Sequence, residues 1–164
     1  MSTTPYQPLP GEQLKVLHVS EELCLYTFQA TRKMARANRG SLGMRLENAV
    51  LKPMDHILRA NDVFLSPDMD DKTRLSELEE RVRLQNKAKH AVHSLTRLAH
   101  VMFLLETITG KQYTQIAKKS TSLYWMIVAW RDSDLKRWGV PESPTGKSPS
   151  KGSSTDESPT DEKG

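Results

Sequence analysis

The sequence predicts an all-α protein with four helices and a disordered C-terminal tail. Four segments between residues 13 and 139 repeat apolar residues at a spacing of three to four, which is typical of amphipathic helices. Turn-forming residues separate these segments. From residue 140 the chain is rich in Ser, Pro and charge and has no aromatic residue. We expect a loose leader over residues 1–12, a helical domain over 13–139 and a disordered tail over 140–164.

The first helix is expected over residues 13–37. Its apolar face has helical spacing and comprises Leu23, Tyr26, Ala30 and Met34, widened by Leu17, Cys24 and Phe28. Asn38, Arg39 and Gly40 break this pattern. Ser41 is then placed to cap the second helix through its hydroxyl group.

The second helix contains a proline. Its apolar stripe is expected to comprise Leu42, Leu46, Ala49, Val50, Ile57 and Phe64. Pro53 lies inside this helix, where a proline removes one backbone hydrogen bond and clashes with the carbonyl four residues back, at a cost of about 3 kcal/mol. We therefore expect a kink near Ala49 or a division into two shorter segments.

An acidic, turn-rich connection precedes the third helix, which is expected over residues 73–107. Asp70 and Asp71 favour its N-terminus, because carboxylates are stabilised at the positive end of the helix dipole. Gln85 falls where the apolar stripe of this helix requires an apolar residue. Gly110 is expected to end the helix.

The fourth helix is expected to begin near Lys111 and is apolar nearly all round between residues 123 and 130. A helix that is apolar on all sides is buried on all sides, whereas a helix of a four-helix monomer has one side in water. The additional apolar residues of this helix predict a subunit interface. The alternative is a deeper core that the N-terminal leader covers. The interface candidates are Tyr124, Trp125 and Val128.

Positive charge is concentrated between residues 81 and 131, where nine bases and one acid, Glu106, give +8 against +4 for the whole chain. The run from residue 23 to 46 has five bases and no acid. Both concentrations of positive charge favour a nucleic-acid partner. A solvated face, or cations that stabilise the negative end of a helix dipole, would give the same charge pattern. The candidate nucleic-acid-binding residues are Arg32, Lys33, Arg36, Arg39, Arg45, Arg83, Lys87, His90, His93, Arg97, His100, Lys118 and Lys119.

Three histidines of the third helix, His90, His93 and His100, share one predicted polar face with Arg97. No cysteine or carboxylate is placed nearby to complete a four-ligand zinc site, so we expect no bound metal. A partly charged face that contacts phosphate and a plain solvated face both remain open.

Several function classes find no support in the sequence. The single cysteine, Cys24, sits among apolar residues and is expected to be a packed core thiol. There is no paired acid and base, no Cys-His arrangement and no Gly-rich phosphate loop, so we expect no enzyme and no cofactor. No signal peptide or membrane-spanning stretch is evident, and we expect a soluble cytoplasmic protein without a membrane partner.

Three segments together resemble the four-helix-bundle family of the accessory variability determinant of diversity-generating retroelements. This family also includes proteins encoded by intervening sequences in bacterial ribosomal RNA genes. The resemblance spans about residues 17–131. It is carried by Arg39-Gly40-Ser41-Leu42-Gly43 with Arg45, by Ile57-Leu58-Arg59-Ala60-Asn61, by the leucine-rich run 95–105, and by Ile108-Thr109-Gly110-Lys111-Gln112-Tyr113 followed by Trp130. The chain departs from the family at Val128-Ala129, where two glycines are common.

The resemblance implies an antiparallel up-down-up-down four-helix bundle that assembles into a basic, ring-shaped homopentamer without catalytic activity. It further implies two partners, a reverse transcriptase and its structured template RNA, and a role in error-prone cDNA synthesis. The alternative is a helical structural or regulatory oligomer that binds only protein.

Overall fold

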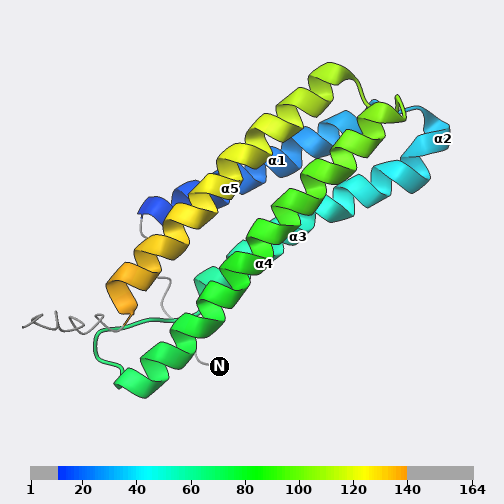
Figure 1. Cartoon of the computed structure of the whole chain (residues 1–164). Coiled ribbons are helices and arrows are strands. Elements are labelled where there is room, and N and C mark those ends of the chain that lie inside the picture. Colours follow the sequence, from blue (N-terminus) through cyan, green and yellow to red (C-terminus); the bar gives the residue numbers. More distant parts are fainter. Residues whose placement is uncertain (1–10, 140–164) are drawn as a thin grey trace, which may run out of the picture.

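The structure, a computed structural model, describes residues 11–139. Every regular element within that range is helical, which confirms the all-α prediction (Figure 1). The first helix begins at Gly11, so the last two residues of the predicted leader are helical. The rest of the leader and the predicted tail over residues 140–164 lie outside the described residues.

Four long helices make up the body: α1 (Gly11–Arg32), α3 (Met44–Asp62), α4 (Asp71–Leu104) and α5 (Gly110–Trp138). Helix α1 packs against α3 and α5, and α4 packs against the same two helices (Figure 1). None of the described helices has both the length and the apolar character needed to cross a membrane.

Apolar residues at helical spacing form one continuous core between these helices. Helix α4 contributes Leu84, Ala88, Val92, Leu95, Ala99 and Met102. Helix α5 contributes Ile116, Leu123, Ile127 and Trp130. These buried positions recur at steps of three or four residues, because each such step returns a side chain to the same side of its helix.

The first helix ends five residues earlier than expected. A turn follows Arg32, and the chain continues through the short α2 (Arg36–Asn38) and the π-helical turn η1 (Arg39–Gly43) into α3. The Arg39 guanidinium donates from Nη2 to the carbonyl of Arg32 at 2.6 Å and to that of Met34 at 3.3 Å. A side chain from beyond the helix therefore satisfies carbonyl groups at its end. The predicted cap at Ser41 is wrong, because Ser41 lies inside η1.

Helix α3 contains Pro53 and is nevertheless one helix, so the predicted division into two segments is wrong. The Pro53 ring is buried, and packing around it offsets the lost backbone hydrogen bond. Nearby, the Cys24 thiol of α1 lies 3.5 Å from the carbonyl oxygen of Val50 and donates to it. Phe64, expected in the apolar stripe, follows the end of α3 and is 56% exposed.

The start of α4 matches the expectation from its acidic residues. The Asp70 carboxylate caps the helix by accepting a hydrogen bond from the backbone N–H of Thr73 at 3.0 Å. Hydrogen bonding by the side chain of Thr73, together with that by its backbone N–H, lowers the pKa of Asp70 from its usual value. The cap satisfies one of the free N–H groups of the first turn.

The connection between α4 and α5 corrects the prediction for Gly110. Helix α4 ends at Leu104, and Glu106 adopts a left-handed conformation, with φ 57°. The N–H of Thr107 donates to the carbonyl of Met102 at 3.0 Å, which closes a Schellman motif. Gly110 instead begins α5, and Thr109 caps that helix in a reciprocal pair of hydrogen bonds with Gln112.

Candidate nucleic-acid interface

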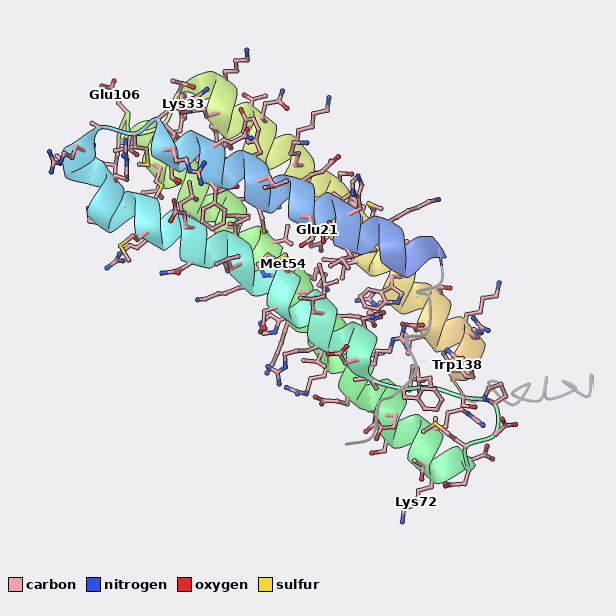
Figure 2. The ribbon with its side chains drawn as sticks, turned by 180° about the vertical axis from the view of Figure 1, so that it is seen from behind. Glu21, Lys33, Met54, Lys72, Glu106 and Trp138 are labelled. Atoms are coloured by element: carbon pink, nitrogen blue, oxygen red, sulfur yellow. The ribbon has the colours of Figure 1, made fainter. Side chains whose placement is uncertain are left out.

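Five of the predicted basic residues lie where α1 ends and α3 begins. All five are exposed, and no acid lies between residues 32 and 45. We call this set the basic end; it comprises Arg32, Lys33, Arg36, Arg39 and Arg45. Figure 2 shows Lys33 and Glu106 at this end of the body, and Lys72 and Trp138 at the other. The basic end therefore lies beside the connection between α4 and α5.

The opposite end of the body is rich in acids. The end of α3, the following loop and the start of α4 carry Asp62, Asp68, Asp70, Asp71, Glu77, Glu79 and Glu80. The same end also carries bases, among them Arg74 and Arg83, which pair with Asp71 and Glu80. Positive charge without interspersed acids is therefore a feature of the basic end and not of this one.

A second basic surface lies on one side of α4. Lys87, His90, His93 and Arg97 are all exposed and recur at a spacing of three to four, which places them on one side of the helix. We call these four residues the α4 face. No salt bridge involves Lys87 or Arg97 among residues 15–139.

Much of the positive charge between residues 81 and 131 is paired with acids from outside that window. Lys119 of α5 lies 3.5 Å from Glu22 of α1, measured from Nζ to Oε2. Arg81 is buried, with its Nε 3.0 Å from Oδ2 of Asp134. The excess of +8 in that window therefore overstated the free positive charge, because folding brings distant carboxylates to these cations.

Two more bases of this window are held by near neighbours in sequence. Arg83 donates to Glu80 from Nε to Oε2 at 2.6 Å, and Arg131 contacts Asp132 at 2.8 Å. Arg83 is a predicted nucleic-acid contact, and this pairing reduces the charge it presents to a phosphate. Lys118 of α5 is exposed and has no salt bridge among the side chains that the structure describes.

The predicted histidine face divides into two environments. His90 and His93 are exposed on the α4 face, whereas His100 is half-buried against Tyr113 of α5, with ring centroids 5.5 Å apart. Within residues 15–139 no three His, Cys, Asp or Glu side chains come close enough together to hold a metal ion. Contact with Tyr113 makes His100 less accessible to a phosphate than the exposed His90 and His93 are.

A pocket of about 570 Å³ lies at the basic end, between the end of α1 and the connection from α4 to α5. It is lined by Lys33, Met34, Ala35, Asn38, Phe103, Glu106, Thr107, Ile108, Thr109, Gly110 and Gln112. Three stretches of chain that are distant in sequence supply these residues. The sequence alone gave no signal for the pocket, because periodicity within single helices does not report contacts between their ends.

The predicted interface residues of α5 differ in exposure. Trp125 is 62% exposed, whereas Tyr124 and Val128 are half-buried. The Tyr124 and Trp125 rings meet edge to face at a centroid distance of 5.3 Å. The interface at these residues stays a prediction, for which the exposed Trp125 is the most accessible of the three side chains.

Helix α3 carries a second exposed apolar surface. Met44, Leu51 and Leu58 are 55%, 37% and 41% exposed. Their seven-residue spacing places them on one side of the helix. This spacing is visible in the sequence, but only the core-facing stripe of this helix was predicted from it.

Comparison with known proteins gives no match to a family model or to a curated protein. The features that bear on function are the basic end, the α4 face, the pocket beside the basic end, and the exposed apolar side chains of α3 and α5.

Proposed function

We propose that this chain is a non-catalytic accessory protein of a diversity-generating retroelement. It binds the reverse transcriptase of the retroelement and its structured template RNA, and supports mutagenic cDNA synthesis. In this proposal the long helices form an antiparallel up-down-up-down bundle, and copies of the bundle assemble into a ring-shaped pentamer. The family resemblance over residues 17–131 supports the proposal, and so do the contacts that α1 and α4 each make with α3 and α5.

The observation that carries the proposal is the basic end. Five exposed cations lie within 14 consecutive residues that contain no acid. Each cation that neutralises a phosphate releases counterions, and this release is the main sequence-independent source of affinity for nucleic acid. In a ring, copies of this surface would repeat around the assembly and raise the local positive potential.

Binding of a structured RNA hairpin at increasing salt tests the proposal. We expect affinity to fall about tenfold or more between low and physiological salt if several phosphates are neutralised. The triple variant Lys33→Gln, Arg36→Gln and Arg97→Gln removes three positive charges that form no salt bridge within residues 15–139. It should bind the hairpin more weakly and show a shallower salt dependence.

A second triple variant controls for net charge. Arg74→Gln, Arg83→Gln and Arg131→Gln also remove three positive charges, but each of these cations is already paired with a carboxylate. The proposal requires the first variant to lose much more affinity than the second, with both retaining the helical circular dichroism of the wild type. Equal losses would mean that only net charge matters.

The alternative of a protein-binding oligomer without a nucleic-acid role draws support from α3. Its exposed stripe of Met44, Leu51 and Leu58 has the spacing by which helices pack against one another. If the hairpin RNA is not bound in a salt-dependent manner, while Leu51→Glu disrupts association with a protein partner, this alternative is the better account.

A further inference from the structure

The pocket at the basic end has the size and the mixed lining of a small-ligand site. Its volume of about 570 Å³ lies within the range of about 300–1,000 Å³ that such sites occupy. Apolar walls come from Met34 and Ile108, and polar groups come from Asn38 and Glu106. A flat molecule with polar edges fits this combination better than a bare ion does.

An aromatic stack ends at this pocket. The Phe103 ring lines the pocket and is 36% exposed. Tyr113 of α5 lies nearly parallel to it, with centroids 5.3 Å apart and planes 11° apart. His100 also contacts Tyr113, with centroids 5.5 Å apart and planes tilted by 38°. The Tyr113 ring of α5 thus packs against the Phe103 ring of α4 and restricts its movement.

The charge around the pocket suits a nucleotide. Lys33 lines the pocket, and Arg36 of α2 is exposed a few residues further along the chain. Figure 2 shows Lys33 and Glu106 at the same end of the body. The Glu106 carboxylate would repel phosphate, but it accepts hydrogen bonds from the amino groups of bases. The Lys33 cation and the acceptors of the pocket lining therefore match the two parts of a nucleotide.

We propose that this pocket binds an unpaired nucleobase of a single-stranded RNA segment, which stacks on Phe103 while Lys33 contacts an adjacent phosphate. The inference rests on the proposed nucleic-acid function and adds to it a preference for unpaired over duplex RNA. Bases in a duplex are stacked on both faces and do not reach such a pocket, whereas bases in loops and bulges do. Stacking on an aromatic side chain tolerates any base, so the site selects for strandedness more than for sequence.

Two RNAs of equal length carrying 2-aminopurine test the inference. One is a hairpin with the fluorescent base in its loop, and the other is a perfect duplex. Both are titrated with the full chain at fixed salt. We expect the loop RNA to bind about tenfold more tightly than the duplex, as stacking of one base on an aromatic ring provides. Its fluorescence should be quenched on binding, while that of the duplex stays nearly constant.

Phe103→Leu removes the stacking face and keeps an apolar wall. It should lower affinity for the loop RNA to near the duplex value and abolish the quenching. Phe64→Leu is the matched control, because Phe64 is the more exposed phenylalanine, at 56%, and lies near the start of α4, whereas Phe103 lies near its end. The control should leave both affinities unchanged.

Ala35→Leu provides an independent variant, since Ala35 lines the pocket and is exposed. The added side chain should obstruct the base without touching the aromatic stack, so the loop preference should again fall. Equal, salt-dependent binding of both RNAs that neither Phe103→Leu nor Ala35→Leu alters overturns the inference and leaves the proposed function intact. Absence of salt-dependent binding to either RNA overturns both.

Discussion

Gln85 of α4 donates from Nε2 to Oδ2 of Asp134 of α5 at a distance of 2.6 Å, in the interior between the two helices. The same oxygen lies 3.0 Å from Nε of Arg81, whose guanidinium lies 5.3 Å from the centre of the Trp130 ring. Burial raises the pKa of the Asp134 carboxyl, while Arg81 and Gln85 oppose that rise. The glutamine that interrupts the apolar stripe of α4 is therefore part of a buried polar cluster that joins the two helices.

Replacing one charged member of this cluster should destabilise the fold far more than replacing both members of the charged pair together. Asp134→Leu leaves the buried guanidinium of Arg81 without its carboxylate, and we expect a loss of about 3–5 kcal/mol in the free energy of unfolding. The double variant Arg81→Met with Asp134→Leu should recover most of this loss, because no buried charge then remains. Urea unfolding followed by circular dichroism measures both. A double variant no more stable than the single one contradicts the interpretation.

Glu106 is a favourable position for glycine. Its φ of 57° places it in the left-handed region, which is strained for a residue with a Cβ and unstrained for glycine. Glycine is also the usual residue at this place in a Schellman motif. We expect Glu106→Gly to raise the free energy of unfolding by about 1 kcal/mol. Glu106→Gln keeps the strain and removes only the charge, so its urea midpoint should stay near that of the wild type.

The Cys24 thiol should be unreactive in the folded protein. Burial raises its pKa above the usual value, to about 11, so that very little thiolate forms near pH 8. A disulfide reagent should therefore modify it slowly in buffer and rapidly in strong guanidinium chloride. Rapid modification of the folded chain would show that α1 and α3 separate readily at this point.

The same shift predicts a pH dependence of stability. A thiol with a raised pKa in the folded state stabilises fully below its unfolded pKa of about 8.5, and this contribution is lost as pH rises toward 11. The difference in unfolding free energy between wild type and Cys24→Ala should therefore shrink from pH 7 to pH 10. The alanine variant lacks this titration and so corrects for lysines and tyrosines. A constant difference across this range would contradict the raised pKa.

Self-association should depend on the exposed tryptophan of α5. Light scattering of the wild type is expected to give a mass several times the chain mass of 18.6 kDa. Trp125→Glu should lower that mass, because a charge at an apolar interface is not compensated. Leu25→Glu is the control, since Leu25 is exposed to the same degree, 64% against 62% for Trp125, but lies on α1. Loss of association in the control alone would place the interface elsewhere.

Sequence reasoning succeeded where a structural feature depends on residues within a few turns of one another. The start of α4 beside Asp70 and the helical periodicity of its apolar residues are of this kind. It failed at the ends of α1 and α4. Helix α1 ends where the Arg39 side chain donates a hydrogen bond to the carbonyl of Arg32. Helix α4 ends where Glu106 adopts the left-handed conformation. Neither feature follows from helical periodicity.

By itself, the sequence determined that the chain is helical, where its apolar faces lie and that cations gather between residues 32 and 45. These properties are local, because a helix forms and orients its side chains through residues three and four positions apart. Only the tertiary structure decided which cations remain available and which residues share a pocket. Glu22 reaches Lys119, and Asp134 reaches Arg81, only because α1 and α4 each pack beside α5. Phe103 and Lys33 likewise line one pocket because the ends of distant helices meet there.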